Sequence, residues 1–280
     1  MIVFPSGFTL SAGLGGVSLK NPRIGYDTCT RGASASQVTV SSERSDAPKD
    51  APLRSSTYEY WQPLELPASW EIIFSDFCSV DYIGIVGNLG SVRASLLAET
   101  TDGTLAGSPS EYVWTQFAQD IIPADDAPIM MLDDARSVRG VRLTVDGDGE
   151  APKIAVVYAG AVLAMVEPIR GGGHAPMTLK RETTLQQSLS RGGQFLDQSY
   201  RRLGEVGSAS FEHLDAAWYR TYFDPFVKAA RKYPFFFAWR PEQYTDEVSY
   251  AWADGDIRPQ YEGSMDWMGV SFGMRGIGHE

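Results

Sequence analysis

The chain has 280 residues, 43% of them hydrophobic and 21% charged, and its formal net charge is −11. These proportions are typical of a chain that builds a packed core, and they exclude wholesale disorder. Residues 1–168 hold 11 basic and 21 acidic side chains, a balance of −10 that argues against a nucleic-acid partner.

The N-terminal segment MIVFPSGFTL has neither the basic start nor the long apolar run of a secretory signal. The longest apolar candidate, 154–166, is too short to cross a bilayer. We therefore expect a soluble protein that is made in the cytoplasm, carries no export address and does not insert into a membrane.

Short apolar runs separated by turn residues follow Trp61. This pattern predicts an antiparallel β-sandwich, and the lack of alternating long helices disfavours a doubly wound sheet. The predicted strands are Trp70–Phe74, Val80–Val86, Val92–Ala98, Val138–Val145 and Ile154–Val166. The last of these runs, Ile154–Val166, is predicted to be two strands, or one strand bent at Gly160.

Residues 167–176 (EPIRGGGHAP) contain three consecutive glycines between two prolines, which suit neither a helix nor a central strand. The charge balance changes at the same place, because residues 169–280 hold 13 basic and 14 acidic side chains. The sequence therefore predicts two domains, 1–168 and 169–280.

The second domain begins with two segments, 178–189 and 194–203, on either side of Gly192-Gly193. They predict a long hairpin, polar on both faces, that contacts another subunit or projects into solvent. The spacing of Leu214, Trp218 and Tyr222, with Asp224-Pro225 after them, predicts two short helices. The helices are expected over about 211–222 and 225–232, and strands over 234–239, 248–253 and 265–274.

The histidines give little support to an enzyme. His174 lies in the glycine-rich boundary, His279 is the penultimate residue, and His213 falls at the start of a predicted helix. No GxSxG nucleophile motif is present, and Gly13-Leu14-Gly15-Gly16 lacks the third glycine of a dinucleotide loop.

The acidic clusters are also weak candidates. Asp146-Gly147-Asp148-Gly149-Glu150 is too short for a calcium loop, so a plain β-turn is favoured over a weak cation site. The pairs Asp125-Asp126 and Asp133-Asp134 could supply the two carboxylates of a glycosidase. The members of each pair are adjacent, so on a strand their side chains would point to opposite faces. Solvated loop charges are therefore favoured. We expect no enzyme, metal site or cofactor, although scattered carboxylates leave an envelope hydrolase as a third hypothesis.

The two cysteines, Cys29 and Cys78, form no CxxC pair. We expect reduced thiols, with a disulfide between them as the alternative. Among the abundant aromatic residues, Tyr58, Tyr60 and Trp61 are weak candidates for a sugar-binding site, the alternative being that they plug the end of the sandwich. The cluster Phe235–Trp239 indicates core or a subunit interface.

Two regions resemble known families. Residues about 20–166 resemble the discoidin-like (galactose-binding-like) jelly-roll module. That likeness rests on Tyr60-Trp61, WEIIF (70–74), VDYIGIVGNLG (80–90), VRGVRLTV (138–145) and IAVVYAG (154–160). Residues about 174–277 resemble the second part of phage tail-tip, or distal tail, and minor tail proteins. That likeness rests on SRGGQFLDQSYRRLG (190–204), FEHLDAAWYRTYFDPF (211–226) and KYPFFFAWRPEQYTDEVSYAWADGDI (232–257).

The resemblances imply a mainly β chain: a jelly-roll β-sandwich, then a β-rich α+β domain with one or two short helices. They imply a structural component of the virion, at the tail tip or baseplate of a long-tailed bacteriophage. Its partners would be further copies of itself in a ring, the tail tube and other tail-tip proteins, with the hairpin and the 234–240 strand as candidate subunit contacts. The alternative function is a carbohydrate-binding module that contacts a glycan on the host surface.

Overall fold

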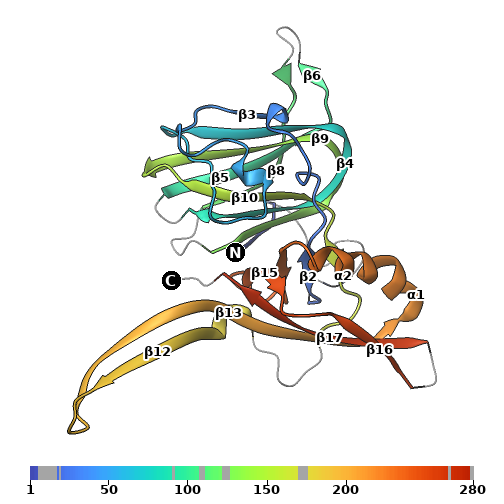
Figure 1. Ribbon diagram of the computed structural model, residues 1–280. Helices are drawn as coiled ribbons and strands as arrows, with labels where there is room; N and C mark the ends of the chain where they lie inside the picture. Colours follow the sequence, from blue (N-terminus) through green and yellow to red (C-terminus); the bar gives the residue numbers. More distant parts are fainter. Residues whose placement is uncertain are drawn as a thin grey trace.

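The computed structural model describes residues 1–5, 18, 20–89, 92–106, 111–121, 127–169, 176–263 and 266–277. These residues form a seven-stranded sheet, an eight-stranded sheet, a small two-stranded ribbon and one helical segment (Figure 1). The predicted fold class is confirmed: a jelly-roll sandwich is followed by a second β-rich module.

The sandwich is built on two long strands, β4 (Ala68–Asn88) and β9 (Ile129–Gly149), which pair with each other and shift register between Ile73 and Cys78. Each strand therefore contributes one half to each layer. The first layer adds β3 (Val38–Val40), β5 (Val92–Thr101) and β8 (Thr115–Ile121). The second layer adds β1 (Ile2–Val3) and β10 (Lys153–Gly160), and the ribbon is β6 (Leu105–Ala106) with β7 (Glu111–Tyr112).

Strand β10 is buried along nearly its whole length, which explains its continuous apolar sequence. One face packs into the sandwich core, and the other face packs against the second sheet. A strand that is buried on both faces loses the polar–apolar alternation of a surface strand. Figure 1 shows this layer between the rest of the sandwich and the second module.

The second sheet has the order β11-β2-β14-β15-β17-β13-β12, with β16 paired to β17. Two of its strands, β2 and β11, come from residues before 168, so the 1–168 segment contributes strands to both sheets. The strands are β2 (Arg23–Gly25), β11 (Leu163–Ala164), β12 (Arg181–Leu189), β13 (Phe195–Asp215), β14 (Phe235–Ala238), β15 (Val248–Ala253), β16 (Arg258–Glu262) and β17 (Trp267–Gly276).

The predicted helix over 211–222 is wrong at its start, because β13 continues to Asp215. A β-bulge between Phe211 and Leu214 inserts an extra residue, and His213 there has φ 59°. The bulge places two buried apolar residues three positions apart, which imitates a helical spacing. His213 therefore lies in a bulged strand, where its ring contacts Trp267.

The helical segment runs without a break from α1 (Ala216–Trp218) through a π-helical turn (Tyr219–Phe223) to α2 (Asp224–Ala230). Asp224-Pro225 does not separate two helices, since Pro225 occupies the first turn of α2, where its missing N–H is tolerated. The segment covers one face of the second sheet through Phe223, Phe226 and Val227.

Strand β14 is not a subunit contact, which corrects that expectation for residues 234–240. Phe235, Phe236 and Phe237 are buried, and β14 lies between β2 and β15. Phe236 faces the sandwich, and its ring centre lies 5.6 Å from that of Tyr158 on β10. It lies 5.1 Å from the ring centre of Tyr250 on the neighbouring strand β15. The aromatic cluster is therefore core and joins the two modules.

Candidate functional site

The hairpin of β12 and the first half of β13 is confirmed, and it projects from the body as an arm (Figure 1). The tip forms as predicted around Gly192-Gly193: Gly193 N donates to Ser190 O at 2.9 Å, and Gly193 has φ 81°. The described side chains between 183 and 199 are exposed, apart from half-buried Ser190.

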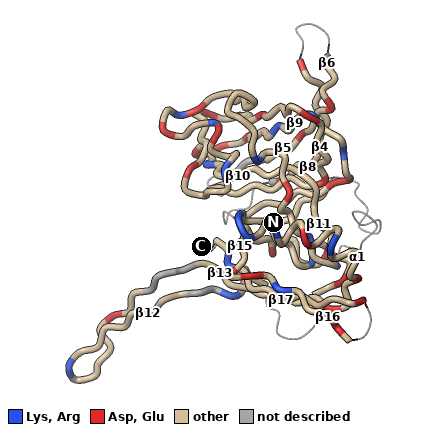
Figure 2. The backbone as a smooth tube through the Cα atoms, turned by 45° about the vertical axis from the view of Figure 1, so that its right-hand side comes forward, with Lys and Arg blue, Asp and Glu red and all other residues tan. Residues whose placement is uncertain are grey.

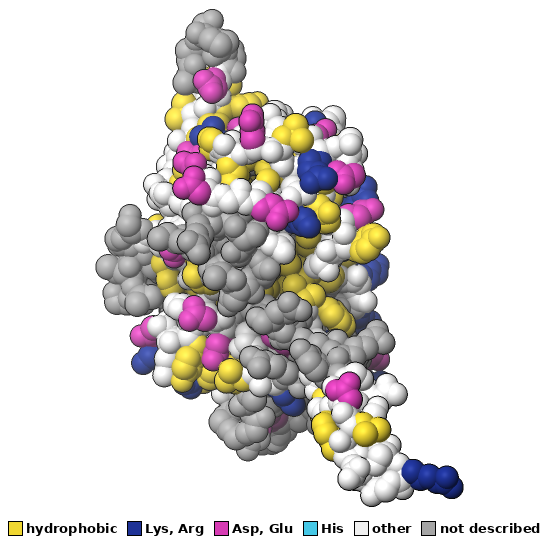
Figure 3. Space-filling model, turned by 90° about the vertical axis from the view of Figure 1, so that its left-hand side faces the viewer, with side chains coloured by type: hydrophobic (Ala, Val, Ile, Leu, Met, Phe, Trp, Pro, Cys, Tyr) yellow, Lys and Arg dark blue, Asp and Glu magenta, His cyan; other side chains and the backbone are white. Residues whose placement is uncertain are grey.

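One face of the arm carries three exposed apolar side chains beside the hydrogen-bonded pair Gln187 and Gln198, although the sequence predicted polar faces on both sides. Leu185 and Leu189 alternate on one face of β12, and Leu189 is paired with Phe195 across the ribbon. These three side chains are 55%, 59% and 62% exposed. The opposite face carries Thr184, Gln186 and Ser188. Figure 3 shows apolar side chains along the arm and a basic tip.

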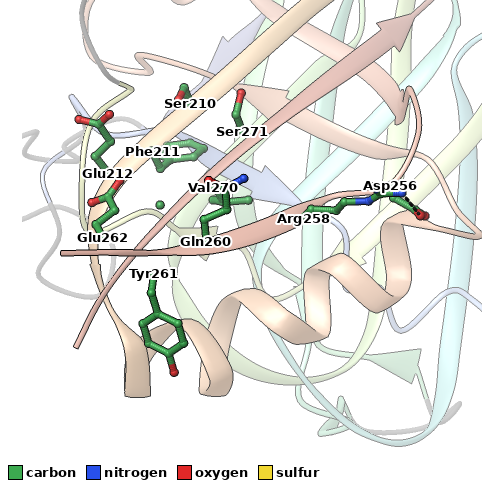
Figure 4. Close-up of a pocket in the computed structure, with 11 residues that line it drawn as sticks. Ser210, Phe211, Glu212, Asp256, Arg258, Gln260, Tyr261, Glu262, Val270 and Ser271 are labelled. Atoms are coloured by element: carbon green, nitrogen blue, oxygen red, sulfur yellow. Dashed lines mark hydrogen bonds and ion pairs between the residues drawn. The ribbon is translucent and has the colours of Figure 1, made fainter. Parts of the chain in front are cut away.

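A hollow of about 410 Å³ lies on the second sheet, where the last part of β13 meets β16 and β17 (Figure 4). This part of β13 is far from the tip of the arm. Its floor is made of small residues, Ser210, Gly269 and Ser271. At one end lie Glu212 and Glu262, and Glu262 Oε2 accepts a hydrogen bond from His213 N at 2.9 Å. At the other end Arg258 pairs with Asp256 at 3.4 Å. No spacing motif in the sequence points to this hollow, because most of its residues come from three different strands.

Of the three predicted sugar-contacting residues, the structure brings Tyr58 and Tyr60 together. They line a pocket of about 380 Å³ with Val86, Ala155 and Lys153, and the Lys153 ammonium lies 5.3 Å from the centre of the Tyr60 ring. Tyr58 is 89% exposed, and Tyr60 is half-buried. The pocket thus combines aromatic rings, the polar Lys153 side chain and the apolar Val86 and Ala155, and such an arrangement can hold a sugar.

Trp61 does not line this pocket. Its side chain is fully buried in the sandwich core, and its Nε1 donates to Ser42 O at 3.0 Å. Its backbone bridges to Ile154. Trp61 therefore plugs the sandwich, which was the alternative for this aromatic cluster.

A buried charged contact joins the two modules and was missed at the sequence level. Arg23 on β2 lies near Asp81 on β4, and Asp81 Oδ1 accepts a hydrogen bond from Val162 N at 2.6 Å. Burial raises the pKa of Asp81 to about 7, and burial lowers the pKa of Arg23 to about 10. No local sequence pattern links residues 23 and 81.

Two of the acidic clusters named from the sequence lie on strand β9. The DGDGE segment is no isolated turn, because β9 runs through it to Gly149. Asp133 is buried and pairs with Arg136. Within the described residues, no group of three or more acidic, histidine or cysteine side chains is placed to hold a metal ion. The 13–16 glycine run, Asp125-Asp126, His174 and His279 lie outside the described residues.

Cys29 and Cys78 are both free thiols, half-buried beside the sandwich core. Burial and contact with the Cys78 thiol raise the pKa of the Cys29 thiol. In the described parts of the chain, no helix is both long and apolar enough to cross a membrane.

Neither a protein-family model nor a curated protein sequence matches the chain. Its N-terminal half resembles carbohydrate-binding modules of solved structure. One is chitosan-binding module 1 of a Paenibacillus sp. IK-5 chitosanase/glucanase, with 13% identity over 48% of this chain and 99% of that module, at a TM-score of 0.40. Another is the family 32 module of Clostridium perfringens NanJ in complex with galactose, with 15% identity over 45% and 94% of the chains, at a TM-score of 0.37.

A Ruminococcus gnavus GH29 fucosidase in complex with fucose is also similar, with 16% identity over 48% of this chain and a TM-score of 0.39. The match spans 26% of the fucosidase chain. These similarities concern the fold of one module.

Proposed function

We propose that this protein is a structural component of the tail tip of a long-tailed bacteriophage, where copies form a ring at the distal end of the tail tube. The observation that supports this is the amphipathic arm. A two-stranded ribbon is marginal alone in water, and three large apolar side chains on one of its faces lie in solvent. A surface of this kind is typical of a segment that is covered in an assembly.

The direction of the arm supports a ring. The arm leaves the body at one end of the second sheet, where it can reach a surface of a neighbouring copy that differs from the arm itself (Figure 1). Contacts between two different surfaces are heterologous, and they generate a ring when the rotation closes. The resemblance of segments 190–204, 211–226 and 232–257 to tail-tip proteins gives the proposed place, in the virion beside the tail tube and other tail-tip proteins. The proposal gives the chain no catalytic role.

The test replaces the apolar face of the arm. We expect the triple variant Leu185→Ser, Leu189→Ser, Phe195→Ser to fold normally, because the three side chains are exposed. Its self-association should weaken by about tenfold or more, since central apolar contacts dominate interfaces. The control is the opposite face, with Thr184→Ala, Gln186→Ala and Ser188→Ala. Equal association of both variants in analytical ultracentrifugation would contradict the proposal.

A second candidate function is binding of a glycan on the host surface, and the Tyr58–Tyr60 pocket is the observation that favours it. The similar modules are described as binding chitosan or galactose. A ring component can display such a module, so the two functions are compatible. We expect a glycan-array signal that Tyr58→Ala abolishes. The control Trp114→Phe, at a half-buried tryptophan outside the pocket, should retain the signal. An empty array would exclude this candidate.

A further inference from the structure

The tip of the arm and the hollow on the second sheet carry opposite charge. Between residues 183 and 199 the only basic side chain is that of Arg191, exposed at the tip. Glu212 and Glu262 lie at one end of the hollow, and the Asp256 carboxylate at the other end faces Arg258 (Figure 4). Figure 2 marks a basic position at the tip and acidic positions along the backbone near β16.

We propose that the hollow receives the arm tip of a second copy of this chain, with the Arg191 guanidinium entering between Glu212 and Glu262. This inference rests on the proposed ring and names its receiving surface. An arginine presents a planar fork of donors that suits carboxylate oxygens.

The shapes of the two surfaces agree with this contact. The tip is slim, because Gly192 and Gly193 follow Arg191 and have no side chains. The hollow has room for the tip, because Gly269 and Ser271 on β17 have little or no side chain. A Cβ at Gly269 would collide with the Glu262 carboxylate, so the glycine keeps that carboxylate over the floor.

Apolar side chains flank the charged contact on both partners. Leu189 and Phe195 come directly before and after the tip and are more than half exposed. Trp267 pairs with Glu262 across β16 and β17, and its ring is 38% exposed. A charged centre bordered by apolar surface is sheltered from water, which strengthens the attraction.

The tip of the arm and strand β16, which borders the hollow, lie at opposite ends of the second sheet in two views (Figures 1 and 2). The nine residues of β12 span about 30 Å, so the arm carries its tip away from its own hollow. The contact therefore joins two copies head to tail, which is the geometry that a closed ring needs.

The test is a charge exchange in the full chain, followed by sedimentation. Arg191→Glu and Glu212→Arg should each weaken self-association by about tenfold or more, because like charges then face each other. The double variant should recover most of the loss. The matched control is Lys180→Glu, an equal charge change at the base of the arm, which should associate like the wild type. Circular dichroism verifies that each variant is folded.

A ring that forms equally well with Arg191→Glu and Lys180→Glu would overturn this contact and leave the proposed ring standing. A double variant no better than the single ones would also overturn it. A wild-type chain that stays monomeric at every concentration would overturn the proposed function, and this contact with it.

Discussion

Asp81 is the residue through which pH should act on stability. In the unfolded chain its pKa is near the ordinary 3.8, whereas burial raises its pKa in the folded protein to about 7. Between these values the folded state holds a proton that the unfolded state has lost. The contribution of Asp81 to the free energy of unfolding is thus fully present below pH 4 and is lost as pH rises through 7.

The variant Asp81→Asn should remove this pH dependence. An amide keeps an oxygen that accepts from Val162 N but carries no charge at any pH. Between pH 4 and 7 the free energy of unfolding of the wild type should fall by roughly 2–4 kcal/mol because of this group, and that of the variant should not. The range is reduced because Asp81 is partly exposed. Urea unfolding at pH 4.5 and 7.5 measures both. Parallel pH profiles for the two proteins would show that Asp81 is not the titrating group.

Gly84 is one of two glycines at which the modules approach each other closely. A Cβ at this position would lie 2.5 Å from the Phe236 ring, and a Cβ at Gly25 would lie 2.5 Å from the Tyr82 ring. Each module thus supplies a glycine against which an aromatic ring of the other module packs. A side chain added at either glycine would push the two layers apart.

We expect Gly84→Ala to lower the free energy of unfolding by roughly 1–3 kcal/mol, because overpacking displaces the Phe236 ring. The control is Gly192→Ala, since a Cβ there meets no atom closer than 3.9 Å. Denaturant unfolding followed by tryptophan fluorescence gives both values. Equal stabilities would mean that the two layers adjust without cost.

At the scale of elements, the helical segment begins at Asp215. Its Oδ1 accepts a hydrogen bond from Trp218 N at 2.8 Å and so satisfies a free N–H of the first turn. Asp215→Ala should cost about 1 kcal/mol of stability, whereas Asp215→Asn should keep most of it. Thermal unfolding separates the two variants, and an alanine variant as stable as the asparagine variant would contradict the cap.

The sequence predicted some elements and misjudged others for definite reasons. The arm and β17 have local signals, a Gly-Gly turn and strict alternation of Met268, Val270, Phe272 and Met274. The start of the 211–222 helix was wrong because a bulge changes the spacing of apolar residues in a strand. The Phe235–Trp239 run was left open as core or subunit interface, and then named as a candidate contact, because an apolar run alone does not tell the two apart.

The candidate sites were harder to predict than the elements. Tyr58, Tyr60 and Trp61 are sequence neighbours, yet Trp61 is in the core while Tyr58 is in solvent. Nothing local decides which aromatic residue faces inward. The hollow at Glu212 and Glu262 depends on the pairing of β13 with β17, two strands that are far apart along the chain.

At the scale of the whole molecule, the sandwich, the second sheet and the arm have separate tasks in the proposed assembly. The buried layer at Phe236, Tyr158 and Tyr250 fixes the two modules to each other, and Tyr250 Oη donates to Ser55 O at 2.9 Å. A rigid body then presents the arm at one end and the hollow at the other, so that each copy can bind two neighbours.

Self-association is the central claim, and the mass of the purified protein in solution tests it most directly. Light scattering, with negative-stain images of the same peak, should give a mass several times 30.7 kDa and closed ring-shaped particles. A mass of one chain at every concentration, with no rings in the images, would contradict the account.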